Sequence, residues 1–175
     1  MITNKKFKGE KILLQCLNKK NISPNYPRWL IDKNINKYLE VRFQNKNELK
    51  KKYFSKINFY NKSKSIILFG IFYNNKHIGN IKIENNKVHR RAEIGLLIGN
   101  KNFWGKGFGT EAIGLASKFA FKYFKCEILF AGSYKSNISS INSFKKAGWK
   151  INCVFKKYWK LNKGREDWVL LSKVN

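Results

Sequence analysis

The sequence predicts an α+β domain, in which helices cover both faces of a mostly antiparallel seven-stranded sheet, and three observations support this fold class. Three apolar or alternating runs follow one another at Ser65–Asn75, Lys76–Asn86 and Arg90–Asn100, with the Asn-Asn and Asn-Lys turns typical of an antiparallel meander. Helical periodicity follows the meander twice, at 109–124 and 137–148. The chain then closes with two strand-like runs.

The elements before the meander are one strand and two helices. Gly9–Asn18 is an apolar run that we expect to form the opening strand. Ser23 is a candidate N-cap with Pro24 at the first helical position, which predicts a helix that turns Trp29 inward. Asn45–Ile57 has the spacing of a lysine-rich amphipathic helix.

The elements after the meander begin with the helix predicted at 109–124, where Ile113, Ala116 and Ala120 recur at intervals of three and four residues. The later elements are a short buried strand at Glu127–Ser133, a helix at Asn137–Gly148, and a hairpin of Trp149–Leu161 with Arg165–Val174. At 175 residues the chain is expected to be one domain, 1–175, large enough to bury a core without disulfides or metals.

The net charge of +27 at pH 7 is the most unusual bulk property. Two interpretations stay open: lysines that are simply solvated, or a basic face that attracts an anionic substrate, cofactor or RNA. The lysines are spread along the chain, which argues against a nucleic-acid-binding block. The N-terminus has no signal-peptide core and no apolar run is long enough to span a membrane. The three cysteines form no metal-ligand pattern. We therefore expect a cytoplasmic protein without a metal.

The stretch "NKNFWGKGFGTEAIGLA" (100–116) carries the chemistry-bearing signal. Gly105, Gly107 and Gly109 lie between an apolar run and a helix, a position where backbone amides commonly hold an anion. A Walker A loop fails because Lys106 is followed by glycine rather than Ser or Thr. The dinucleotide fingerprint fails because the spacing is G-x-G-x-G and a meander precedes it. A tight turn without a ligand explains one glycine but not three.

Three motifs in order carry a family resemblance. "AEIGLLIGNKNFWGKGFGTEAI" (92–113) resembles the acetyl-CoA signature of the GNAT acetyltransferase superfamily in its ribosomal-protein N-acetyltransferase (RimJ/RimL-type) branch. "NISSINSFKKAGW" (137–149) and "KHIGNIKI" (76–83) are similar to further segments of that branch. The resemblance implies a GNAT-like mixed sheet with a V-shaped splay between the central strands "AEIGLLIG" and "EILFAGS". It also implies acetyl-CoA as co-substrate and no metal.

The resemblance also implies which residues contact acetyl-CoA. Pantetheine would pair with backbone groups near Leu97, Ile98 and Gly99. The glycine turn would place backbone N–H groups around the pyrophosphate at a helix N-terminus, through Trp104, Gly105, Lys106, Gly107, Phe108, Gly109 and Thr110. Lys106 either adds a charge there or is a solvated lysine. Asn137 matches the family's pantetheine-contacting asparagine and is equally suited to cap a helix.

Two catalytic residues are predicted. Glu93 lies on the central strand near the implied splay and is the candidate general base, the alternative being a surface carboxylate paired with neighbouring arginines. The family's usual tyrosine acid is absent because Phe144 occupies its position. The resemblance assigns that role to Ser140, whose alternative role is to satisfy helix-start amides. Glu111 is interpreted as complementing the helix dipole.

The acceptor site is expected between the first strand and the meander, where family members build much of it. Candidate residues there are Trp29, Tyr38, Glu40 and Arg42. We predict an N-acetyltransferase that acts on a primary amine of a small molecule, such as an amino sugar or antibiotic, by direct attack in a ternary complex. An anionic or nucleotide-linked molecule is one candidate for this acceptor, and the enzyme is expected to be a monomer or homodimer. The alternatives are a protein N-terminal acetyltransferase, an enzyme acting on charged tRNA, or a CoA- or RNA-binding module without catalysis.

Overall fold

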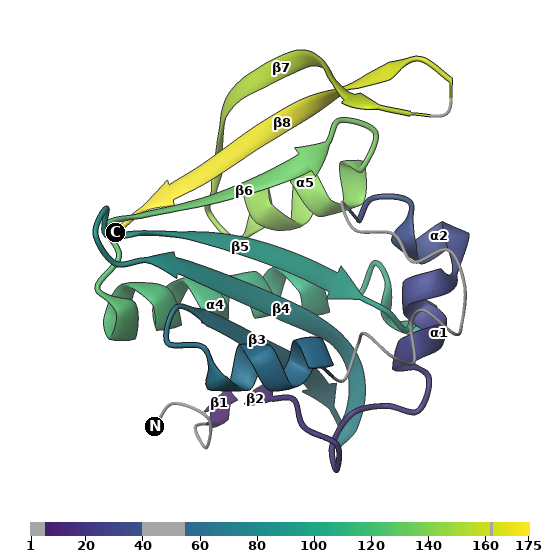
Figure 1. The fold of residues 1–175 in the computed structure, drawn as a ribbon, viewed down its shortest axis with the longest axis vertical. Helices are drawn as coiled ribbons and strands as arrows, with labels where there is room; N and C mark the ends of the chain where they lie inside the picture. The colour runs from purple at the N-terminus through teal and green to yellow at the C-terminus, as the bar shows by residue number, and fades with distance from the viewer. Residues whose placement is uncertain (1–5, 40–54, 162) are drawn as a thin grey trace.

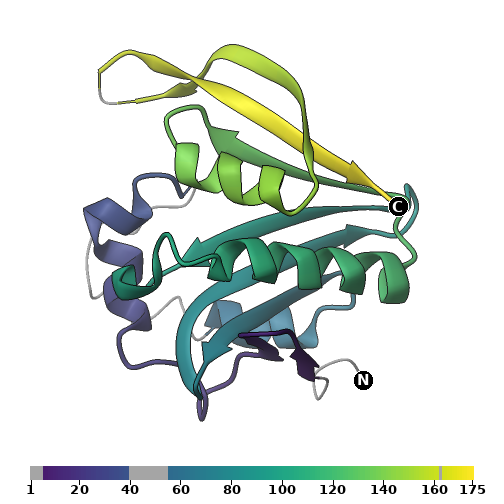
Figure 2. The same ribbon diagram turned by 180° about the vertical axis from the view of Figure 1, so that it is seen from behind.

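The computed structural model describes residues 6–39, 55–161 and 163–175, which form one open sheet with helices on both faces (Figures 1 and 2). Its eight strands run in the order β1-β2-β3-β4-β5-β6-β8-β7. All neighbours pair antiparallel except β5 and β6, which are parallel. The strands are β1 (Lys6–Lys8), β2 (Leu13–Cys16), β3 (Ile66–Tyr73), β4 (Lys76–Asn86), β5 (Arg91–Ile98), β6 (Ile128–Tyr134), β7 (Lys150–Lys160) and β8 (Arg165–Val174).

The predicted mixed α+β sheet is confirmed, with eight strands instead of seven. The extra strand arises because the opening segment doubles back: the N–H of Gly9 donates to the carbonyl of Ile12 (2.8 Å), and Lys6–Lys8 then pairs with β2. The meander follows the expected turns. Asn74 and Asn75 have φ of 46° and 60°, the pair of positive values that a tight two-residue hairpin turn needs.

The helices differ in length from those expected. They are α1 (Tyr26–Ile31), α2 (Lys33–Asn36), α4 (Phe108–Phe124) and α5 (Ile138–Lys146), with a short 3-10 turn η2 (Lys101–Phe103). The predicted helix after Ser23 is broken into α1 and α2 by Asp32, whose carboxylate accepts the N–H of Asn34 and starts α2. Most of the helix predicted at 45–57 lies outside the described residues. Its last residues are described, and they belong to a helix at 55–62.

Two clusters of buried side chains hold the sheet between its helices. On the face shown in Figure 2, which we call the back, α4 packs Ile113, Ala116 and Phe119 onto the sheet. On the face shown in Figure 1, the front, Trp29 and Phe72 belong to a second cluster. Strand residues alternate between these two clusters, so each strand has one set of side chains for each face.

The two central strands part. The register between β5 and β6 ends at Glu93 opposite Phe130, although β5 continues to Ile98 and β6 to Tyr134. Each strand stays paired on its outer side, β5 with β4 and β6 with β8. The sheet therefore opens into a V beyond Glu93, which confirms the predicted splay.

Candidate active site

A cavity of about 760 Å³ lies at the open end of the V. Four segments far apart in the sequence line it: the end of β5, the glycine turn before α4, the first turns of α5, and α2 with the residues after it. The structure thus brings the two longest family-like motifs to one place. Predicted site residues in the lining are Tyr38, Leu97, Ile98, Trp104, Gly105, Gly107, Phe108, Gly109, Thr110, Asn137 and Ser140.

The backbone groups that face the V follow from the strand register. The N–H of Gly99 donates to the carbonyl of Ile78 on β4 (3.0 Å), so Gly99 faces the sheet rather than the splay. Backbone direction alternates along a strand, which turns Leu97 toward β4 as well and turns Leu96 and Ile98 toward the V. Of the three predicted strand positions only Ile98 points its backbone groups into the V. Leu96 was missed, and only the pairing with β4 identifies it.

The glycine turn presents an unsatisfied helix N-terminus to the cavity. Gly107 is the N-cap of α4 with φ of 85°, and no side chain caps the helix. The N–H of Glu111 makes the first bond back to Gly107 (3.0 Å), which leaves the amides of the preceding turn without intrahelical partners. A 17-residue helix concentrates positive potential at this end. These amides suit the pyrophosphate of a CoA ester.

Two further features shape this turn. Gly109 lies against the strand and α5, since a Cβ there would be 3.1 Å from Leu96 and 3.7 Å from the hydroxyl of Ser143. The indole N–H of Trp104 donates to the carbonyl of Ile98 (2.7 Å), so the tryptophan fastens the turn to the end of β5. This bond occupies the cleft-facing carbonyl of Ile98 and leaves its N–H directed into the V.

Among the described residues, the lysines that line the cavity are Lys37, Lys101 and Lys146. Lys106, which the sequence predicted at the site, is not part of this lining. Lys101 forms an ion pair of 2.7 Å with Asp32, the cap of α2, and this hydrogen bond lowers the pKa of the Asp32 carboxyl. Lys37 and Lys146 could not be predicted from a local sequence pattern, because they lie at the ends of two different helices, α2 and α5.

The start of α5 holds Asn137 and Ser140. The side-chain oxygen of Asn137 accepts the N–H of Ser140 (3.3 Å), so Asn137 is the helix cap. Its side-chain NH₂ group is a separate donor, and Asn137 also lines the cavity. Phe144 is 2% exposed and packs edge-on against Trp149, with ring centroids 4.8 Å apart. It fills the core and cannot serve as a proton donor.

Glu93 lies on the front face at the closed end of the V, outside the main cavity. It lines a smaller cavity of about 410 Å³ and stands directly opposite Glu84 on β4. The ammonium of Lys82 lies 2.9 Å from the Glu84 carboxylate. Burial opposes the charged form of Lys82, but the hydrogen bond to Glu84 and the charges of Glu84 and Glu93 raise its pKa. The predicted base thus belongs to a charged group on the front of the sheet.

Trp29 does not reach the cavity lining. It is 7% exposed and packs against His77, with ring centroids 5.2 Å apart, in the front cluster. The N–H of Ser23 donates to Nδ1 of His77 (3.1 Å), so the other ring nitrogen carries the proton that Asn80 accepts (2.8 Å). Trp29 therefore packs against the end of β5 from the front of the sheet, and its ring is buried in this contact instead of facing the cavity.

Tyr38 closes one side of the V. Its hydroxyl donates to the carbonyl of Ser136 (3.2 Å), and its ring contacts that of Tyr134 with centroids 5.8 Å apart. The tyrosine thus joins the end of α2 to the turn between β6 and α5. Glu40 and Arg42, the other predicted acceptor residues, lie outside the described residues.

Glu111 has a structural role that extends the predicted one. Its carboxylate accepts the N–H groups of Lys11 (2.9 Å) and Ile12 (3.3 Å), which fastens the start of β2 to the first turn of α4. The Glu111 carboxylate is therefore bound to the backbone before β2. Because it points there, it does not compete with an anion for the amides at the start of α4.

Comparison with known proteins agrees with this geometry. A family model described as "Acetyltransferase (GNAT) domain" matches residues 12–150. No curated protein sequence matches the chain. Spermidine N-acetyltransferase from Vibrio cholerae, solved with CoA and spermine, is 19% identical with a TM-score of 0.81 over 95% of this chain and 96% of that chain.

Two other solved structures are similar in fold. A microcin self-immunity acetyltransferase in complex with acetyl-CoA and AMP is 21% identical, with a TM-score of 0.76 over 95% of this chain and 94% of that chain. An acetyltransferase from Salmonella typhimurium that modifies the N-terminal serine of a 50S ribosomal subunit protein is 13% identical, with a TM-score of 0.79 over 95% and 96%.

The splayed sheet, the glycine turn and the uncapped helix define an acyltransferase that binds a CoA thioester. The chain belongs to the GNAT acetyltransferase family, and it is an N-acetyltransferase that uses acetyl-CoA. The residues present fit that co-substrate, because the cavity offers free helix-start amides, lysines and the open edge of β5. In the described part of the chain no three His, Cys, Asp or Glu side chains gather as a metal site. No helix there is both long and apolar enough to cross a membrane.

Proposed function

We propose that this enzyme acetylates a primary amine on a small, anionic acceptor that enters from the front of the sheet. The observation that carries the proposal is the bridge from Tyr38 to Ser136, which spans the V between α2 and α5. A bridged opening suits a small molecule better than a wide groove made for a polypeptide. The solved structures do not choose between these acceptors, because small-molecule and ribosomal-protein acetyltransferases are both similar to this chain in fold.

The charge of the protein favours an acceptor that carries negative groups. The chain has a net charge of +27, and among the described residues the charged side chains that line the main cavity are all lysines. A field of this sign concentrates anions near the cleft and repels polycations. An amine attached to a phosphate or carboxylate is therefore favoured over a free polyamine.

Two residues are proposed to move protons, one on each face of the sheet. Acetyl-CoA supplies the acetyl group as a thioester when bound. Glu93, on the front, would take the proton of the acceptor ammonium, directly or through a water. Ser140, on the first turn of α5 at the back, would protonate the thiolate that leaves. The N–H of Ile98 points into the V and would polarise the carbonyl.

The test is acetyl-CoA consumption with amino sugars, nucleotide-linked amino sugars, polyamines and N-terminal peptides as acceptors. We expect turnover with small anionic amines, lowered by salt because screening weakens the attraction. Turnover restricted to peptides would instead identify a protein N-terminal acetyltransferase. Failure of acetyl-CoA to bind in calorimetry would overturn the assignment of the cavity.

A further inference from the structure

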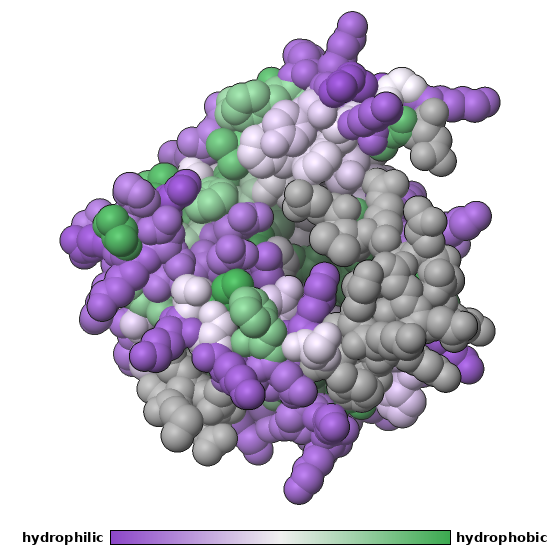
Figure 3. Space-filling view, in the orientation of Figure 1, coloured by the Kyte–Doolittle hydropathy of each residue, from purple (hydrophilic) through white to green (hydrophobic). Residues whose placement is uncertain are grey.

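Five aromatic side chains gather on the front of β6, β7 and β8, and we call them the aromatic shelf: Tyr134, Phe155, Tyr158, Trp159 and Trp168. Tyr158 stacks on Trp168 with centroids 4.9 Å apart and planes 24° apart, and Tyr134 stacks on Trp159 at 4.9 Å and 18°. Phe155 and Tyr158 are 45% and 49% exposed. Figure 3 shows pale and green side chains gathered over this hairpin, bordered by purple hydrophilic ones.

The aromatic shelf lies on the same face of the sheet as Glu93. Glu93 is paired with Phe130, and Tyr134 stands four residues farther along β6 on that face, opposite Trp168 on β8. The indole of Trp168 covers Gly132, where a Cβ would be 2.2 Å from its Nε1. At about 3.3 Å per residue, the positions of Gly132 and Tyr134 lie roughly 7 and 13 Å along β6 from Phe130, the partner of the candidate base.

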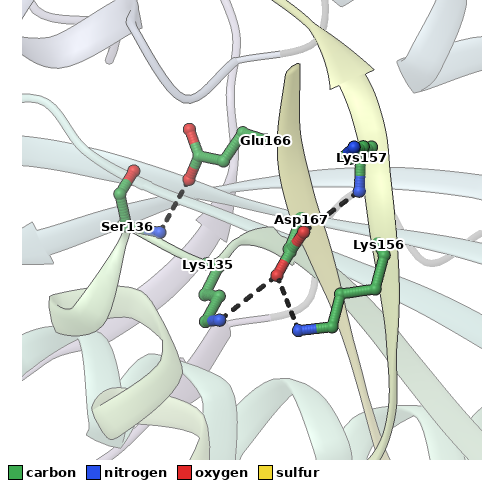
Figure 4. A network of polar contacts seen from close by, with 6 residues as sticks. All are labelled: Lys135, Ser136, Lys156, Lys157, Glu166 and Asp167. Atoms are coloured by element: carbon green, nitrogen blue, oxygen red, sulfur yellow. Dashed lines mark hydrogen bonds and ion pairs between the residues drawn. The ribbon is translucent and has the colours of Figure 1, made fainter. Parts of the chain in front are cut away.

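The hairpin is held in the shape that exposes these rings. β7 bulges between Phe155 and Trp159. The Asp167 carboxylate accepts the N–H of Lys157 (3.0 Å) and pairs with Lys135 (3.2 Å) and Lys156 (3.3 Å), as Figure 4 shows. These contacts hold the pKa of Asp167 at about 2.

Arg165 also holds the same bulge in place. Its guanidinium donates to the carbonyls of Lys157 (3.1 Å) and Tyr158 (3.3 Å). Exposed aromatic area on a rigid frame is typical of a binding surface, because the side chains lose little conformational entropy when a ligand binds.

Trp159 contributes a further feature. Among the described residues, its indole N–H is a buried donor without a hydrogen-bond partner.

The hairpin that carries the aromatic shelf is rich in cations. Lys157 lies within the bulge, and Lys160 and Lys163 follow toward the hairpin tip. Lys156 and Arg165 are already engaged, by Asp167 and by backbone carbonyls respectively. The two acids of this hairpin are already engaged, Asp167 as described and Glu166 with the N–H of Ser136 (2.7 Å; Figure 4). Stacked aromatic rings beside lysines form the combination that recognises a nucleobase together with its phosphates. A neutral sugar would leave the cations unused, and a polyamine would be repelled by them.

We propose that the aromatic shelf binds the base of a nucleotide-linked acceptor, with its phosphates near Lys157 and the lysines of the hairpin tip and its amine directed toward Glu93. This inference rests on the proposed function and specifies the acceptor class. The separation between the aromatic shelf and Glu93 leaves room for a ribose and phosphates between base and amine.

Calorimetry on the CoA-saturated enzyme tests the proposal, because bound CoA prevents nucleotides from entering its own site. UDP and ADP are the probes, with uridine and pyrophosphate as half-ligands. We expect at least one diphosphate to bind more tightly than either half. Tyr158→Ala should weaken that binding about tenfold or more, because the base loses an aromatic ring on which it stacks. Tyr158→Trp should retain binding.

Tyr123→Ala, which removes a 38%-exposed tyrosine on the back face, is the matched control and should bind nucleotide as wild type does. Unchanged CoA affinity verifies that each variant is folded. Absence of binding by both diphosphates, or wild-type affinity in Tyr158→Ala, overturns the proposal. If the enzyme acetylates simple amines but binds no nucleotide, the nucleotide-binding role of the aromatic shelf is refuted and the proposed function stands. Nucleotide binding without acetylation of any acceptor refutes the proposed function alone.

Discussion

Gly99 lies flat against the indole of Trp29, so closely that a Cβ on Gly99 would be 2.0 Å from the ring. The contact joins the end of β5, where the V is widest, to α1 and the front cluster. It explains why a tryptophan predicted to bind substrate is instead buried. It also shows that the position of the cleft-facing Ile98 depends on packing from the far side of the sheet.

Gly99→Ala should therefore destabilise the fold. A methyl group cannot be placed without displacing Trp29, and such overpacking costs roughly 1–3 kcal/mol. Chemical denaturation should show a lower midpoint with an unchanged slope. A midpoint equal to that of wild type would contradict the contact.

The left-handed conformation of Gly107 predicts a second effect. Gly107→Ala meets no atom within 4 Å, but φ of 85° costs a residue with a Cβ roughly 1–2 kcal/mol. We expect a higher KM for acetyl-CoA because the helix-start amides shift. Gly114→Ala in the interior of α4, also without close neighbours, should raise the free energy of unfolding by about 1 kcal/mol and leave that KM unchanged.

Glu93→Gln tests the proposed base. The substitution keeps the shape of the side chain but cannot accept a proton, so kcat should fall by about 10²–10⁴. The fall in activity that we expect of the wild-type enzyme on acidification should be absent from the variant. Glu127→Gln, which removes a surface carboxylate paired with Arg90, should change neither property. Unchanged kcat in Glu93→Gln across pH 6–9 would assign the base role elsewhere.

Tyr38→Phe should loosen the bridge across the V. The variant loses a hydroxyl that bonds to Ser136, a contact that contributes about 0.5–1.5 kcal/mol. The KM for the acceptor should rise by roughly twofold to tenfold, while the KM for acetyl-CoA stays near its wild-type value. Steady-state kinetics with each substrate varied in turn separates the two, and equal changes in both would count against a bridge on the acceptor side.

His77 makes stability depend on pH near neutrality. Burial lowers its pKa, so the unfolded chain binds a proton that the folded protein rejects. This contribution to the free energy of unfolding is complete above the unfolded pKa of about 6.5 and is lost as the pH falls below it. Urea denaturation at pH 7.5 and 5.5 should show the decrease. His77→Gln should reduce that difference, whereas replacing His89, exposed on the turn after β4, should not.

Much of the fold and part of the site could be predicted from the sequence. Alternating apolar residues predicted the meander, and Asn74–Asn75 predicted its tight turn. The spacing of Gly105, Gly107 and Gly109 predicted an anion-binding turn at a helix start. These signals are local, because each depends on backbone conformation within a few residues. The short strand β1 has no such signal, since it exists only by pairing with β2.

The sequence by itself indicated an anion-binding turn, because a glycine turn specifies short-range geometry, and the resemblance of three motifs to a known family indicated the class of protein and the donor. Tertiary structure alone decided that Leu96 rather than Gly99 turns its backbone toward the V and that the inward-facing Trp29 packs against Gly99 instead of lining the cavity. It also decided that Tyr134 and Trp168 stand together on the face of Glu93. These relationships depend on the register between strands distant in the sequence, and a register shift of one residue would reverse every face.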